Sequence, residues 1–148
     1  MAKIDYYLQI DRVVGECQVP RFLNWIPLLA YSFDDRQSVA LGSGRSTGKV
    51  QIQTFHFTME ANRASPKLYL ACAQGSPIKW AKLECVQSGL SFCRVTFQDV
   101  TVSDFQTGGM AGGELPVNSV CLQFSGLTQE YTKLLAQYST PGWQMRRR

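Results

Sequence analysis

The sequence lacks any run that approaches the roughly 18 apolar residues of a membrane-spanning helix. It also opens with Met-Ala-Lys-Ile-Asp, which contains no apolar stretch of the kind found in secretory signal peptides. We therefore expect a protein that is made in the cytosol and has no membrane span. Any export must use a route that needs no cleaved N-terminal signal.

Histidine and paired cysteines are scarce as well. His56 is the only histidine, which excludes a multi-histidine metal site. The number of cysteines is odd and no two form a CxxC pair, so neither a disulfide framework nor a zinc knuckle is indicated. A nucleophilic Cys–His pair stays open because such pairs form in space, although no local motif supports one. We expect reduced, mostly buried thiols at Cys17, Cys72, Cys85, Cys93 and Cys121.

Charge is low, at 18% of residues, and the net charge is +4. Three of these positive charges belong to the C-terminal residues Arg146, Arg147 and Arg148. A short basic tail is usually a solvated segment, and the remainder of the chain carries almost no net charge. We therefore predict no nucleic-acid-binding surface.

Motifs for catalysis and nucleotide binding are also missing. Residues 42–49 contain three glycines, but Lys49 is followed by Val50 and a predicted strand, whereas a phosphate-binding loop continues into a helix. The glutamates are scattered and form no pair suited to acid–base chemistry. We therefore expect neither an enzyme nor a bound cofactor or metal. The glutamates considered for such a pair are Glu60, Glu84, Glu114 and Glu130.

The composition is that of one folded domain, which we assign to residues 1–148. Hydrophobic residues make up 45% of the chain, enough for a substantial core. Short segments of alternating or β-branched residues, bounded by turn residues, predict many strands. Pro27 places its strand at an edge or at a bulge. The predicted strands are 4–10, 23–33, 50–59, 78–86, 91–98, 100–105 and 117–127, and 129–138 is either a last strand or a helical turn.

The segment 48–75 organises the rest of the chain. Its first half is a strand whose apolar side chains switch faces near Thr54, which indicates a bulge or a strand covered on both sides. Its second half predicts a short helix over residues 65–75. Ser65 is suited to the N-cap, Pro66 to the first helical position and Gly75 to the C-terminal end. Leu68, Ala71 and Cys72 share one face, and so short a helix must dock on a sheet.

Many short strands with one helix predict a mainly β fold, either a small β-barrel or a two-sheet sandwich with a flanking helix. Residues 34–49 form a long polar stretch between two strands that are apolar on both faces. We interpret it as an extended loop that projects from the body. Strands with excess apolar surface predict association with further copies of the chain.

Several short motifs resemble the Hcp family, the haemolysin-coregulated tube proteins of type VI secretion. The resemblance spans nearly the whole chain in the family's order. The matching segments are Gly48-Lys49-Val50, Phe55-His56-Phe57-Thr58, Ala64-Ser65-Pro66-Lys67-Leu68, Ala71-Cys72, Asp99-Val100-Thr101-Val102-Ser103, Thr107-Gly108-Gly109 and Val120-Cys121-Leu122-Gln123-Phe124.

This resemblance implies a structural subunit whose hexameric rings stack into the inner tube of the secretion machine. It further implies a surrounding sheath, a spike at the tip and small effectors carried in the lumen. The alternative that the residues leave open is a monomeric ligand-binding β-barrel with an enclosed cavity. The resemblance assigns subunit or ring contacts to Asp34, Asp35, Arg36, Gln37, Ser43, Arg45, Ser46 and Lys49.

Overall fold

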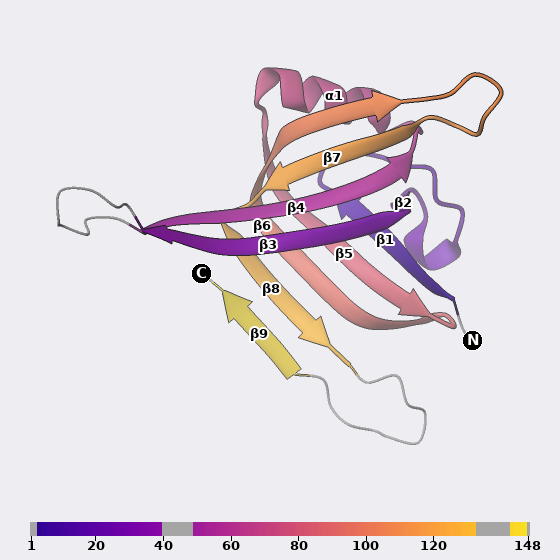
Figure 1. The fold of residues 1–148 in the computed structure, drawn as a ribbon. Coiled ribbons are helices and arrows are strands. Elements are labelled where there is room, and N and C mark those ends of the chain that lie inside the picture. The colour runs from indigo at the N-terminus through magenta and orange to yellow at the C-terminus, as the bar shows by residue number, and fades with distance from the viewer. Residues whose placement is uncertain (1–2, 40–48, 133–142, 148) are drawn as a thin grey trace.

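The computed structural model describes residues 3–39, 49–132 and 143–147, and it is mainly β (Figure 1). Alternating apolar residues form strands along most of this length, and one α-helix interrupts them, as the sequence predicts. In chain order the elements are β1 (Ile4–Ile10), a 3-10 turn (Pro20–Phe22), β2 (Ile26–Leu28), β3 (Ala30–Val39), β4 (Lys49–Glu60), α1 (Ser65–Gln74), β5 (Pro77–Gln87), β6 (Leu90–Gly108), β7 (Val117–Gln123), β8 (Gly126–Tyr131) and β9 (Trp143–Arg147).

The strands form two antiparallel layers that share one long strand, as Figure 1 shows. The first layer has the order β2-β1-β5-β6-β8-β9, and the second has the order β6-β7-β4-β3. The N-terminal half of β6 belongs to the first layer and its C-terminal half to the second. Of the two architectures that the sequence allowed, the sandwich-like one is therefore correct, and the sheet does not close into a barrel.

The layers separate at a corner in β6 where the sequence predicted a gap between two strands. Asp99 adopts a left-handed φ of 54° there, so 91–98 and 100–105 form a single bent strand. Its carboxylate accepts a 2.7 Å hydrogen bond from Ser125 Oγ. The predicted strand 117–127 breaks at the same corner, because Gln123 pairs with Thr101 in one layer and Gly126 pairs with Gln98 in the other.

The core fills the space between the layers. Strand β4 contributes Phe55, Phe57 and Met59, all at most 1% exposed. The β3–β4 register runs without a shift past Thr54, so the bulge considered there is absent. Phe97 on β6 lies at the centre, with its ring centroid 4.7 Å from that of Phe55 and 4.8 Å from that of Phe124. These side chains belong to one large cluster that also takes in Leu68 of α1.

Helix α1 ends as predicted but begins differently. Gly75 closes the helix with φ 63°, and the N–H of Ser76 donates to the carbonyl of Ala71 at 3.1 Å. The prediction of Ser65 as N-cap is wrong, because Ala64 holds that position and makes no side-chain cap. The Ser65 hydroxyl instead accepts from the N–H of Asn62 and donates to Asn118 on β7 at 2.6 Å.

Asn118 joins the start of α1 to the sheet. This side chain is 1% exposed; its Oδ1 accepts from Ser65 Oγ, and its Nδ2 donates to Thr107 Oγ1 at 2.8 Å. We expect Asn118→Ala to lower the free energy of unfolding by about 1–3 kcal/mol, because the partly buried Ser65 hydroxyl and the exposed Thr107 hydroxyl both lose their partner. Urea unfolding measures this change. Ser119→Ala, one residue along and exposed, is the matched control, and an equal loss in both variants would contradict the prediction.

The predicted strand 23–33 is split in the structure. Its first residues follow the 3-10 turn, and the rest form β2 and β3. These two strands meet at Leu29, and the Leu29 N–H donates to the carbonyl of Thr58 at 2.8 Å. Pro27 lies in β2, an edge strand, as predicted. The 3-10 turn packs Phe22 on the outside of the first layer, with ring centroids 4.4 Å apart between Phe22 and Tyr7.

The C-terminal arginines also differ from expectation. Arg146 and Arg147, which were predicted to lie in a solvated tail, lie in strand β9, opposite Thr128 and Leu127 of β8. Such pairing between distant segments carries no local sequence signal. Residues 129–131 continue as strand β8, whereas 133–142 lie outside the described residues.

Candidate functional site

The predicted extended loop begins and ends in a two-stranded ribbon. Strand β3 continues to Val39 and β4 begins at Lys49, so both ends of the predicted loop 34–49 are strand. Residues 34–39 pair with 49–54 in continuous register. Because β4 pairs with β7 only from Thr54 onward, the outer part of the ribbon has no third strand among the described residues. Figure 1 shows it extending beyond the body.

The ribbon brings together five of the eight predicted contact residues. Asp34, Asp35, Arg36 and Gln37 lie on β3, and Lys49 is the first residue of β4. The other three, Ser43, Arg45 and Ser46, fall outside the described residues. The expectation of a projecting arm is therefore correct for its base, although the arm is built from strands where a loop was predicted.

The second layer presents a polar outer face, which we define by twelve outward positions on β3, β4, β6 and β7. Where the structure describes its side chains, this face carries hydroxyls, amides, two acids, one imidazole and one thiol but no lysine or arginine. The Ser103 hydroxyl donates to Cys121 O at 3.2 Å, which is one of several bonds along the sheet. The positions are Ser32, Asp34, Thr54, His56, Thr58, Thr101, Ser103, Asp104, Gln106, Ser119, Cys121 and Gln123.

His56 and Cys121 meet on this polar face. Their Nε2 and Sγ atoms are 3.7 Å apart, so the Cys–His proximity that the sequence left open does occur. His56 is exposed, whereas Cys121 is 9% exposed and offers little surface to a substrate. Within the described ranges no group of three His, Cys, Asp or Glu residues is placed to hold a metal ion.

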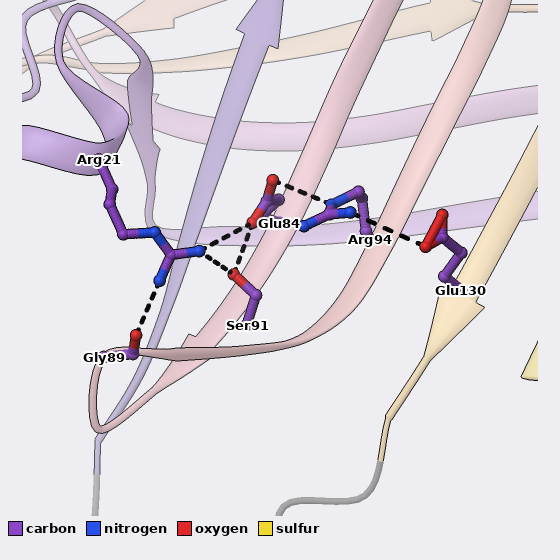
Figure 2. A network of polar contacts seen from close by, with 6 residues as sticks. All are labelled: Arg21, Glu84, Gly89, Ser91, Arg94 and Glu130. Carbon is purple, nitrogen blue, oxygen red and sulfur yellow. Dashed lines mark hydrogen bonds and ion pairs between the residues drawn. The ribbon is translucent and has the colours of Figure 1, made fainter. Parts of the chain in front are cut away.

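The outer face of the first layer carries a charged network centred on Glu84 (Figure 2). The Glu84 side chain is 10% exposed, and its carboxylate accepts from Ser91 Oγ at 2.5 Å and from Arg94 Nε at 3.1 Å. Arg21 lies 3.9 Å away and donates to the carbonyl of Gly89 at 2.9 Å. The network thus ties the 3-10 turn to the β5–β6 hairpin.

We expect Arg94→Met to lower the free energy of unfolding by about 1 kcal/mol. Arg94 makes the direct hydrogen bond to a buried carboxylate, but its own side chain is 45% exposed and screened by solvent. Arg21→Met should cost less, because its guanidinium approaches Glu84 only to 3.9 Å. Thermal unfolding of both variants tests the order, and a larger loss for Arg21→Met would contradict it.

A pocket of about 590 Å³ lies where α1 meets the end of β1, the start of β5 and the corner of β6 at Asp99. Lys67, Lys79 and Arg12 line it together with Asp11 and Asp99. Its walls also include Leu70, Ala71, Ile78 and Val100. Mixed charges and aliphatic walls suit a contact with another protein surface. They do not supply the nucleophile and neighbouring base that a hydrolytic site needs.

Comparison with known proteins decides the family. The family model described as "Type VI secretion system effector, Hcp" matches residues 7–131. The chain belongs to the Hcp family of type VI secretion proteins. The resemblance drawn from the short motifs is therefore confirmed.

Two relatives illustrate the likeness. Protein hcp1 of Pseudomonas aeruginosa is 28% identical over 134 residues, which cover 86% of this chain and 83% of that protein. The crystal structure of Hcp1 from Salmonella typhimurium superposes with a TM-score of 0.81 at 28% identity, covering 99% of this chain and 95% of the other.

A third structure supports the fold alone. A type VI secretion system effector from Yersinia pestis gives a TM-score of 0.79 at 21% identity, covering 97% of this chain and 98% of that one. Like its Hcp relatives, this chain is therefore a mainly β protein of the type VI secretion machinery. In the segments that the structure describes, no helix is long and apolar enough to span a membrane.

Proposed function

We propose that this Hcp-family chain is a structural subunit of the type VI secretion inner tube, that it assembles into stacked hexameric rings, and that small effectors travel in the lumen. Residues 1–148 then act as one domain, without enzymatic activity. The observation that carries the proposal is the polar face on one side of a sandwich whose edge strands are incompletely paired. Sheath and spike proteins of the same machine are the proposed further partners, and export follows passage through the machine.

Incompletely paired edges favour association of copies. Within the described ranges, β3 and β9 each have only one neighbouring strand. An edge strand exposes N–H and C=O groups that can pair with another chain. Repeated contact between two different surfaces of identical subunits gives a closed ring or a filament.

The polar face fits the wall of a water-filled channel. Short side chains such as Ser32, Thr58 and Ser119 can bond water or a passing polar protein surface. Because the described part of this face has no cation, it would not trap acidic cargo by strong ion pairs. The outer face of the other layer, with its charged Glu84 network, is suited to the outside of the ring.

Electron microscopy with two matched substitutions tests the proposal. The wild type at micromolar concentration should form rings with a central channel. Ser119→Trp, on the polar face, should narrow that channel, whereas Thr96→Trp, on the outer face of the first layer, should leave it unchanged. A strictly monomeric protein would refute the tube. If Thr96→Trp narrowed the channel and Ser119→Trp did not, the outer face of the first layer would line the lumen. That result would contradict the assignment of the polar face to the lumen.

We further propose that residues 34–49 contact neighbouring subunits or rings. Replacing 40–48 by a shorter turn should reduce stacking, because it removes the proposed contact residues Ser43, Arg45 and Ser46. The far-ultraviolet circular dichroism should not change, since β3 and β4 stay paired over their inner part. Light scattering that shows undiminished stacking would contradict this contact role.

A further inference from the structure

Two of the five cysteines face each other across neighbouring strands. Cys85 of β5 and Cys93 of β6 are direct partners in the antiparallel register. Both point into the core, and they are 1% and 9% exposed. Strands β5 and β6 form a hairpin, so the two residues are also close along the chain. None of the other cysteines stands opposite a cysteine in any strand pair of the described residues.

The spacing of these two positions suits a disulfide. Directly opposite residues in an antiparallel pair have Cα atoms about 4.5 or 5.5 Å apart, and disulfides span Cα distances of about 4.4–6.8 Å. The two thiols are close enough for each to shift the pKa of the other, and Cys85 Sγ donates to Tyr31 Oη at 3.7 Å. The β5–β6 register also shifts between Cys85 and Val86, so the ladder is irregular beside the pair.

The surroundings make the two sulfurs chemically unequal. The neighbouring Cys85 thiol lowers the pKa of Cys93 below its ordinary value. The interaction with Cys93, followed by burial, raises the pKa of Cys85. The thiolate is the reactive form of cysteine, and Cys93 is also the more exposed of the two, at 9% against 1%. Cys93 is therefore the sulfur that attacks first, and Cys85 is the one that resolves.

We propose that Cys85 and Cys93 form an oxidation site that a small hydroperoxide converts to a disulfide. The Cys93 thiolate attacks one peroxide oxygen, the O–O bond breaks, and hydroxide leaves Cys93 as a sulfenic acid. The Cys85 sulfur then attacks the Cys93 sulfur. The S–O bond breaks, and water leaves with the proton of Cys85. In sum, two thiols and one hydrogen peroxide give one disulfide and two waters.

The other cysteines lack this arrangement. Cys17 packs with Tyr7 and Phe22 in the cluster on the first layer, and Cys121 lies beside His56. Cys72 is on α1. The oxidation site depends only on the β5–β6 hairpin and not on the proposed function. If the chain leaves the reducing cytosol as proposed, the same pair meets oxidising conditions after export.

The test begins with the intact wild-type chain. The reduced protein is treated with hydrogen peroxide, free thiols are alkylated, and proteolytic peptides are mapped by mass spectrometry. We expect one linked peptide that joins Cys85 to Cys93 and lacks the mass of two hydrogen atoms, while Cys17, Cys72 and Cys121 are alkylated. Alkylation of both Cys85 and Cys93 after peroxide treatment would overturn the proposal. Oxidation of Cys93 to a sulfinic or sulfonic acid while Cys85 remains an unlinked thiol would also overturn the proposal.

Variants test the order of the two steps. In Cys85→Ser, peroxide should leave a sulfenic acid at Cys93 that a dimedone probe captures. Cys93→Ser should show no such labelling at Cys85. Cys121→Ser, which removes a buried cysteine outside the pair, should form the disulfide as the wild type does. Equal dimedone labelling of Cys85→Ser and Cys93→Ser would reject the assigned roles. Should a serine variant fail to fold, the mapping of the wild type still decides whether the disulfide forms.

Discussion

Phe97→Ala is expected to lower the free energy of unfolding by about 3–5 kcal/mol, the typical loss for a buried aromatic residue. The Phe97 side chain is 1% exposed and contacts the rings of Phe33, Phe55 and Phe124, so β3, β4 and the connection between β7 and β8 all pack on it. A domain of this kind is stable by only about 5–15 kcal/mol, so the substitution removes a large part of its stability.

Denaturant unfolding measures the effect of Phe97→Ala. The matched control is Leu90→Ala, a residue of the same strand that is 62% exposed and should change stability by less than about 0.5 kcal/mol. Comparable losses in the two variants would mean that the centre of the core lies elsewhere. A loss below about 1 kcal/mol in Phe97→Ala would mean that the layers do not pack on this ring.

Leu68→Ala is expected to lower the free energy of unfolding by about 2–5 kcal/mol. Helix α1 has 10 residues, which is too few for an isolated helix to be stable in water. Leu68 is its one fully buried side chain, and Ala71 and Cys72 pack beside it against the core. Without Leu68, most of the contact that holds the helix on the sheet is lost.

Leu70→Ala is the matched control on the same helix. Its side chain is 49% exposed, and leucine and alanine both favour helix, so little change is expected. Hydrogen exchange at the amides of α1 adds a second readout, because a loosened helix exchanges faster than the sheet. Unchanged exchange and stability in Leu68→Ala would show that the helix is held by its ends and not by this side chain.

The main elements of the fold could be predicted because each has a local signal. Alternation of apolar residues marks β1 and β7, and Gly75 marks the end of α1. The switch of layers was missed because it is a property of two strands together. Strand β8 pairs with the part of β6 before Asp99, and β7 pairs with the part after it. The bend at Asp99 therefore depends on both neighbouring strands.

The starting residue of the helix was missed for a similar reason. Ser65 has a side chain suited to capping, but Asn62 accepts from the Ala64 N–H, and Asn118 binds the Ser65 hydroxyl. These competing partners come from the preceding turn and from β7. The pairing of β9 with β8 likewise depends on contacts between segments that are separated in sequence.

The candidate site was predicted in part. The ends of the polar stretch 34–49 were correctly identified as part of a projecting feature, because the stretch lies between two strong strands. Residues 23–33 were predicted as one strand that is apolar on both faces. The structure divides this segment, and Leu23 and Leu29, which are 55% and 54% exposed, lie beside the strands. The polar face was missed because it forms only when the outward residues of four strands are placed in register.

Strand β6, 19 residues long, has a mechanical consequence. One unbroken backbone runs through both layers, and Leu29 links β2 to β3 on a second path. Sliding one layer over the other would therefore stretch covalent bonds as well as separate packed side chains. A displacement of either layer is therefore passed to the other through the backbone of β6.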